Sequence, residues 1–209
     1  DLGGLRVAIS PDLGSAMLSD AVRERVLDAG HRLVGALGLE LDDVEVSLPR
    51  IDWEWAIANQ VGLYLEVGDL WPGCEGQMTR SMAFGMRMGL ERFDLGVAAR
   101  VEAGRTEANE RMAALFDQVD VVICASNPDV AFPAEIESNT RVAGEKSPAG
   151  NNGALTIPAN ISGNPAVSVP AGLVDGLPVG LQLMGRQHED RTVLGLAAAP
   201  RMQAQFFPD

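Results

Sequence analysis

The sequence has almost no lysine. Lys146 is the only lysine among sixteen basic residues, and twenty-nine acidic residues give a formal net charge of −13. Binding to a nucleic-acid backbone requires clustered cations that displace counterions, so this balance argues against a nucleic-acid partner. The shortage of lysine also limits the hydrolase mechanisms that use a lysine base.

Long apolar runs and paired cysteines are also missing. No run reaches the roughly 18–20 apolar residues that cross a bilayer, so we predict no membrane partner. The chain opens with DLGGLRVAIS, which has no basic-then-apolar leader. Cys74 in WPGCEG and Cys124 in VVICAS lie in unlike contexts, which argues against a disulfide framework. The sequence therefore predicts a cytoplasmic protein.

What the chain does contain is enough apolar sequence for a core, since 46% of its 209 residues are hydrophobic. Alternating apolar residues predict a strand over residues 5–9 and another over residues 44–48. Between them, apolar residues at spacings of three and four predict a helix over residues 22–37, with Ser19 as its N-cap. A strand, a helix and a strand in this order predict two parallel neighbours.

The middle of the chain reads as helical. Residues 53–70 predict one helix, and a Gly-rich loop follows it. The segments FDLGVAARVEAG and RTEANERMAALFDQ predict two more helices, broken at Gly104. Met82, Met86 and Met88 lie close together; they suit either a plastic binding surface or, more commonly, the filling of a core.

The last third reads as strands and loops. VDVVICA predicts a strand buried on both faces, and residues 127–152 predict a long polar loop. Residues 166–169 and 179–184 predict a hairpin that turns at Asp175-Gly176, after a break at Gly163-Asn164-Pro165. The fold class that follows is α/β, with a mixed sheet flanked by helices.

Each candidate for chemistry has a stronger structural reading. Lys146 and Ser147 are adjacent in an extended loop, so their side chains point apart and cannot form a dyad. Cys124 could act with His31 or His188 as its base, but a thiol that ends an apolar strand is buried and inert. His31 lies on an amphipathic helix, where it is expected to face water.

Metal and phosphate sites have no support in the residues. His188, Glu189 and Asp190 are consecutive and cannot converge on one ion, so we predict no metal site and read Asp190 as the cap of the last helix. Residues 150–153 lack the spacing of a phosphate-binding loop, and no cofactor is predicted. On residues alone, no catalytic group can be assigned.

Four stretches together resemble the amidase signature family. GNPAVSVPAGLVDGLPVGLQLMGRQHED is similar to that family's C-terminal region and is the most specific of the four. LRVAISPDLG, FDLGVAARVEAG and VDVVICASNPDVAFP agree with the family in the same order. The resemblance covers nearly the whole chain. It implies that residues 1–209 form a single, incomplete α/β domain, the C-terminal half of the amidase signature fold.

The resemblance also implies a function. Family members hydrolyse amides, or move ammonia from glutamine, with a serine nucleophile, a second serine in a cis peptide and a lysine base, all in a Gly-Ser-rich signature that this sequence lacks. The chain is therefore expected to be the C-terminal portion of an amide hydrolase and inactive alone, with no catalytic residue of its own. Its expected partners are the N-terminal catalytic half, a small-molecule amide and a second copy of itself. The alternative is a non-catalytic binding or assembly module derived from an amidase.

The substrate-pocket wall that the resemblance implies consists of Asn127, Pro128, Ile157, Gly163 and Asn164. The sequence departs from the family at three places. Ser126-Asn127-Pro128 stands where a Thr-Pro loop is usual. Gly153-Ala154 stands where glutamine-dependent members carry an acidic residue, which favours a general amidase over a tRNA amidotransferase. Pro200 is expected to end or kink the last helix near Ala199.

Overall fold

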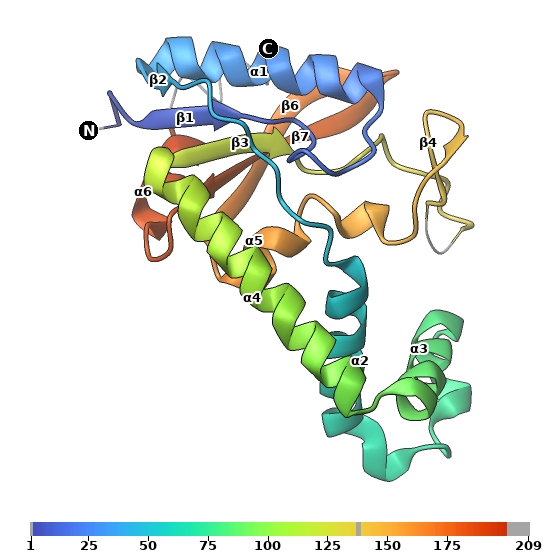
Figure 1. Cartoon of the computed structure of the whole chain (residues 1–209). Coiled ribbons are helices and arrows are strands. Elements are labelled where there is room, and N and C mark those ends of the chain that lie inside the picture. Colours follow the sequence, from blue (N-terminus) through green and yellow to red (C-terminus); the bar gives the residue numbers. More distant parts are fainter. Residues whose placement is uncertain (1, 137–138, 200–209) are drawn as a thin grey trace.

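A mixed five-stranded sheet forms the body of the molecule (Figure 1). The computed structural model describes residues 2–136 and 139–199. The strand order is β2-β1-β3-β7-β6. The pairs β2-β1 and β1-β3 are parallel, and β3-β7 and β7-β6 are antiparallel. The predicted α/β fold with a mixed sheet is confirmed. The strands are β1 (Arg6–Ile9), β2 (Glu40–Leu41), β3 (Val121–Ala125), β6 (Ala166–Val174) and β7 (Leu177–Gly185).

The first crossover forms as predicted, except for its second strand. Helix α1 (Asp20–Leu37) begins at Ser19, whose Oγ accepts a hydrogen bond from the Val22 N–H at 3.4 Å. β2 pairs with β1 in parallel, but it lies at Glu40–Leu41, and residues 44–48 form no strand. Val46 and Leu48 are buried in the main core. The alternation that predicted a strand there reflects packing against the core.

Strand β3 is the centre of the core. All five of its residues are buried, as the apolar run predicted. Helix α1 packs across β6, β7, β3 and β1, and helix α6 (Asp190–Ala197) packs on β6 and β7. Helices α4 (Leu95–Gln118) and α5 (Ile157–Ser162) lie on the other side of the sheet from α1 (Figure 1). The sheet thus has helices on both sides, as the fold class predicted.

A helical arm extends away from this body (Figure 1). We call residues 52–95 the α2–α3 arm. It contains α2 (Asp52–Val67), the short 3-10 helices η1 (Gly68–Leu70) and η2 (Glu75–Gln77), and α3 (Arg80–Arg92). No described helix is long and apolar enough to cross a bilayer.

Helix α4 joins the arm to the sheet without interruption, so the predicted break at Gly104 is wrong. Gly104 lies where α4 packs against α2, and a Cβ there would lie 2.9 Å from Cγ of Glu54 on α2. The glycine lets the two helices approach closely.

The final hairpin turns at Asp175-Gly176, as predicted. Asp175 has φ +52° and Gly176 has φ +79°, the left-handed pair that a type I′ turn requires. The two strands are longer than predicted, because pairing continues past an irregularity between Pro170 and Gly172. The predicted loop of residues 127–152 contains a small hairpin, β4 (Arg141–Val142) and β5 (Glu145–Lys146), and reaches η3 (Asn151–Gly153).

The last described helix begins one residue earlier than the predicted cap implied. Glu189 is the N-cap residue of α6, and Asp190 lies inside its first turn. Asp190 therefore does not cap the helix, although its charge complements the helix dipole. The helix ends at Ala197, close to the predicted end near Ala199, and Pro200 lies outside the described residues.

Candidate functional site

Two serine hydroxyls meet where β3 ends. Ser126 follows β3, and its Oγ lies 2.5 Å from Oγ of Ser168 on β6. Both side chains cross over Gly180 of β7, where a Cβ would lie 2.6 Å from Oγ of Ser126 and 2.7 Å from Oγ of Ser168. The Ser126 N–H also donates to the Gly180 carbonyl at 3.0 Å. A residue larger than glycine at position 180 would therefore displace one or both hydroxyls of the pair.

A cavity of about 340 Å³ opens beside Gly180. This volume is within the usual range for small-molecule sites. The predicted candidates Asn127 and Pro128 both line it: Asn127 is exposed, and the Pro128 carbonyl accepts a hydrogen bond from the Ser19 N–H. The remaining lining comes from the loop after β3, the polar segment before α5 and the start of β7: Asp129, Val130, Ala131, Phe132, Asn139, Asn152, Pro178 and Val179.

Asp129 is the only charged residue among the described residues that line this cavity, and its carboxylate already accepts hydrogen bonds. One oxygen accepts a hydrogen bond from the Ala143 N–H at 2.7 Å and the other from the Val130 N–H at 2.9 Å. Asp129 thus holds the β4-β5 turn in place. The described part of the lining contains no histidine, lysine or cysteine. This end of the sheet can bind polar groups through hydrogen bonds, but it offers no base that could activate Ser126 or Ser168.

The other three pocket candidates lie elsewhere. Ile157 packs with Ile51 and Ala108 in a small apolar cluster. Gly163 ends α5 with φ +71°. Asn164 is buried and donates from its side-chain nitrogen to the Gly185 carbonyl at 2.8 Å, beside a second cavity of about 390 Å³. Since Gly185 pairs with the first residue of β3, the structure places Asn164 at the opposite end of that strand from Asn127.

The serine pair is what sequence reasoning missed. Alternation along β6 contained the signal, because Ala166, Ser168 and Pro170 are exposed while Val169 and Ala171 are buried. The hydroxyl at position 168 therefore had to lie on the open face. Its pairing with Ser126, which lies 42 positions away in the sequence, depends on the strand order.

Cys124 is an inert thiol, as predicted. It has no exposed surface, and burial raises its pKa to about 12. The side-chain nitrogen of Gln182 donates to its sulfur at 3.1 Å. Both Cys74 and Cys124 are free.

Of the remaining candidates for chemistry, His31, His188 and Lys146 are exposed, whereas Ser147 is buried. His31 is exposed, and its Nδ1 lies 2.7 Å from the Leu27 carbonyl oxygen. Lys146 is exposed on β5. Among the described residues, no three His, Cys, Asp or Glu side chains are grouped so that they could hold a metal ion.

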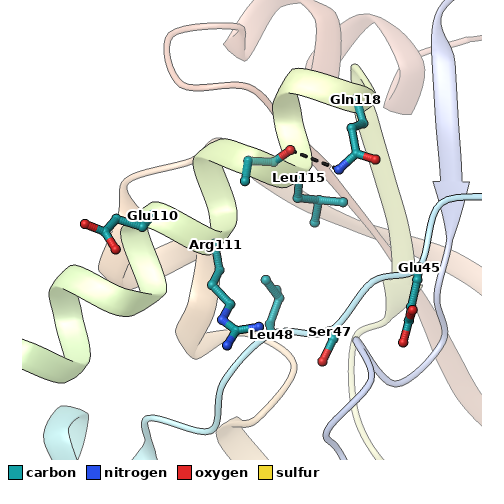
Figure 2. Close-up of a pocket in the computed structure, with 8 residues that line it drawn as sticks. Glu45, Ser47, Leu48, Glu110, Arg111, Leu115 and Gln118 are labelled. Carbon is teal, nitrogen blue, oxygen red and sulfur yellow. Dashed lines mark hydrogen bonds between the residues drawn. The ribbon is translucent and has the colours of Figure 1, made fainter.

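Another hollow, of about 530 Å³, is an open polar groove between α4 and residues 45–48 (Figure 2). Arg111 extends toward Leu48 and Ser47, whereas Glu110 points away (Figure 2). Arg111 pairs with Glu107 one turn earlier at 3.2 Å, and both side chains are more than half exposed. Gln118 donates to the Ala114 carbonyl on the same helix. These are the contacts of a solvated helix face.

The strongest charge cluster is structural and lies at the beginning of β3. Asp120 accepts hydrogen bonds from the Arg6 side chain and backbone N–H and from the Arg186 side chain, at 2.9–3.3 Å. Burial alone would raise the pKa of Asp120, but the hydrogen bonds from the two arginines outweigh burial and lower it. The cluster ties β1, β3 and the end of β7 together.

Known proteins are similar in sequence to this chain over part of their length. The chain is 31% identical over 226 residues to a glutamyl-tRNA(Gln) amidotransferase subunit of Exiguobacterium sibiricum, a match that covers 95% of this chain and 45% of that protein. The corresponding amidotransferase subunit of Thermoanaerobacter pseudethanolicus is 26% identical, with 99% and 46% covered. The chain therefore spans about half the length of these relatives.

Solved structures share the fold. A bacterial aryl acylamidase of the amidase signature family superposes with a TM-score of 0.78 at 21% identity, covering 95% of this chain and 43% of that one. A crystal structure of an amidase gives a TM-score of 0.79 at 22% identity, covering 98% and 46%. The glutamyl-tRNA(Gln) amidotransferase subunit of Thermotoga maritima gives 0.63 at 23% identity, covering 98% and 43%. The model of the Amidase family matches residues 77–194, more than half of the sequence, and the chain therefore belongs to the amidase family.

Proposed function

We propose that this chain is the carboxy-terminal portion of an amide hydrolase and is inactive alone. One observation carries the proposal: a member of the amidase family that spans about 45% of its relatives brings two serines together with no base in the neighbouring cavity. We treat residues 1–209 as one incomplete α/β domain. A cytoplasmic location is part of the proposal and is supported by the two free cysteines.

In this proposal the cavity beside Gly180 forms one wall of the substrate pocket. Asn127 and Asn152 place amide groups at the cavity, and the one carboxylate among its described lining residues, that of Asp129, is already hydrogen-bonded. Such a lining suits a small, uncharged amide, whose N–H and C=O groups need acceptors and donors. Asn127 and Pro128 are the binding residues, and Gly180 keeps the strand open for them.

The catalytic half would join the sheet at β6. This nine-residue strand pairs with β7 alone among the described strands, so its other edge presents backbone N–H and C=O groups. The exposed Ala166, Ser168 and Pro170 lie along the same strand. A neighbouring strand from the catalytic half would satisfy the edge and bring its own nucleophile and base toward the serine pair.

The proposal favours a general amidase over a glutamine-dependent enzyme. A Cβ at Gly153 would lie 2.6 Å from Cδ1 of Ile157, so an acidic side chain does not fit there without repacking. Ala154 is buried. A carboxylate at the position that grips a substrate ammonium in glutamine-dependent members would therefore require the Ile157 side chain to move.

The first test uses the chain alone. We expect ammonia release from benzamide to equal the buffer blank, and a serine-directed fluorophosphonate probe to leave Ser126 and Ser168 unlabelled, because neither hydroxyl has a base. Release above the blank that disappears in Ser126→Ala would contradict the proposal.

The second test adds the missing half. The chain is co-expressed with the portion of the Exiguobacterium sibiricum protein that precedes the matched region, and ammonia release is measured for the mixture and for each part. We expect hydrolysis in the mixture alone. Asn127→Ala should raise KM there by roughly tenfold and change kcat by less than about twofold, because Asn127 binds and does not react. A complex that forms but hydrolyses no amide would favour the assembly module.

A further inference from the structure

Helix α2 is apolar around most of its circumference, yet none of its residues is buried. Ten of its sixteen residues are apolar, and at 100° per residue they are spread around most of the axis, apart from a narrow polar stripe: Trp53, Trp55, Ala56, Ile57, Ala58, Val61, Leu63, Tyr64, Leu65 and Val67. A helix of this kind is ordinarily enclosed by other protein. In this structure its neighbouring elements are α3, α4, α5 and η1. These cover it only in part.

The exposed apolar surface of the molecule gathers on the α2–α3 arm and at its junction with α4. Ten of the sixteen large hydrophobic residues that are exposed in the described chain belong to it, and Leu65 and Leu95 are the most open, at 79% and 86%. At roughly 150–250 Å² for a whole large side chain, half-exposed residues in this number present on the order of 1,000 Å². A standard interface takes about 800 Å² from each partner, so the arm exposes enough apolar area for one.

The packing inside the arm is also incomplete. A cavity of about 370 Å³ lies between α2 and α3 and is lined by Gln60, Val61, Tyr64, Met86, Gly89, Leu90 and Phe93. Oε1 of Gln60 is buried and has no hydrogen-bond partner among the described residues. Its amide lies against Gly85, where a Cβ would be 2.8 Å from Oε1. The Gln60 amide oxygen beside this cavity is therefore available to a hydrogen-bond donor from a partner or from water.

The charges of the two helices are opposite in sign. Helix α2 carries Asp52, Glu54 and Glu66 and no basic residue. Helix α3 carries three arginines and one glutamate. Within the described chain, Asp52 pairs with Arg50 and Arg87 pairs with Glu75, whereas Glu66, Arg80 and Arg92 form no ion pair.

We propose that the α2–α3 arm binds a second copy of this chain, with α2 of each protomer on α3 of its partner. In a two-fold dimer each contact occurs twice, so an acidic helix facing a basic helix is complementary at both places. The same arrangement buries the apolar side chains of both arms. The interface is separate from the β6 edge that the proposed function assigns to the catalytic half, and it does not depend on that function.

The test is sedimentation equilibrium of the whole chain at concentrations from about 1 µM to about 100 µM, with circular dichroism as the check on folding. We expect a concentration-dependent dimer. Leu65→Glu should raise the dimer Kd by about a hundredfold or more, because it places a carboxylate in the apolar contact. Leu173→Glu on β6 and Leu194→Glu on α6 are matched controls with similarly exposed leucines, and they should change the Kd by less than about threefold.

Charge reversal tests the orientation. Glu66→Arg alone, and Arg80→Glu with Arg92→Glu, should each raise the Kd by about tenfold, and the three changes together should restore most of the affinity. A monomer at every concentration would overturn the proposal and leave the arm to another polypeptide. A dimer that survives Leu65→Glu but is lost in Leu173→Glu would overturn it in favour of pairing through the β6 edge. A triple variant that binds no more tightly than Glu66→Arg alone or the Arg80→Glu, Arg92→Glu double variant would overturn the α2-on-α3 orientation.

Discussion

Strand β3 and helix α2 are both rich in apolar residues, and the structure treats them in opposite ways. All five residues of β3 are buried between helices, whereas α2 has no buried residue. The contrast shows that apolar content determines how much surface must be buried. The arrangement of the elements determines whether the chain itself can bury that surface. The apolar residues of the sheet body are buried by other elements of this chain, whereas many of those in the arm stay exposed.

The largest expected effect separates the two regions directly. Ile123 has no exposed surface at the centre of β3, so Ile123→Ala should lower the free energy of unfolding by about 3–5 kcal/mol. Leu65 on α2 is 79% exposed, and Leu65→Ala should cost less than about 0.5 kcal/mol in the monomer. Urea unfolding at low protein concentration measures both. Equal losses of unfolding free energy in the two variants would show that Leu65 is buried in solution and would contradict the difference between β3 and α2.

Glycines sharpen the same comparison. Gly180→Val should cost about 1–3 kcal/mol, because the new side chain collides with the hydroxyls of Ser126 and Ser168. Gly62 on α2 has no atom within 4 Å of where its Cβ would lie. Gly62→Ala should therefore stabilise the arm by about 0.5–1 kcal/mol through helix propensity. Thermal unfolding followed by circular dichroism distinguishes the two signs, and a destabilising Gly62→Ala would show a contact on that face.

A substitution in the hairpin turn tests how much the exposed end of the sheet body contributes to stability. Gly176 has φ +79°, which costs a residue with a Cβ about 1–2 kcal/mol, so Gly176→Val should destabilise by at least that amount. Lys146→Ala on the exposed β5 strand should change stability by less than about 0.5 kcal/mol. Denaturant melts of the two variants are compared with the parent chain. Similar losses in both would refute the turn assignment.

The last expected effect depends on pH and concerns the sheet body alone. Hydrogen bonds from Arg6 and Arg186 lower the pKa of Asp120 in the folded chain below its ordinary value of 3.8. Its contribution to stability is therefore fully present well above that ordinary value and is lost as the pH falls through the lower folded-state pKa. Asp120→Asn should cost about 1 kcal/mol at neutral pH, and the difference should shrink in acid.

The control for this prediction is Asp28→Asn, which removes an exposed ion pair of α1 with Arg32. It should change the unfolding free energy by less than about 0.5 kcal/mol at any pH. A loss in Asp120→Asn that stays constant down to the acid transition would contradict the role of the carboxylate charge.

Local signals predicted most of the sheet body. Ser19 caps α1, β3 is a buried run and Asp175-Gly176 turns the hairpin, because each depends on residues close in sequence. Two predictions failed where distant packing decides. Gly104 looked like a break, but it admits Glu54 of α2, and residues 44–48 alternate like a strand while they pack on the core without a partner strand.

The candidate site was predictable only in part. Asn127 and Pro128 follow a strand that the sequence identifies, so their place at its end could be inferred, and they share a cavity. The contact between Ser126 and Ser168 requires β7 to lie between β3 and β6 with Gly180 in register, and no local pattern contains that order. The position of Asn164 could not be predicted either. It lies at the opposite end of β3 from Asn127, and this also depends on how β7 pairs with β3.

Helix α4 makes the two regions mechanically dependent on each other. It runs unbroken for 24 residues, about 36 Å at 1.5 Å per residue, with Met112, Leu115 and Phe116 seated in the core below the sheet and Leu95 at the arm (Figure 1). A rigid lever of that length turns a tilt of about 10° at the seated end into a displacement of about 6 Å at the far end. A small change in how these three side chains pack against the sheet would therefore move the arm by several ångströms.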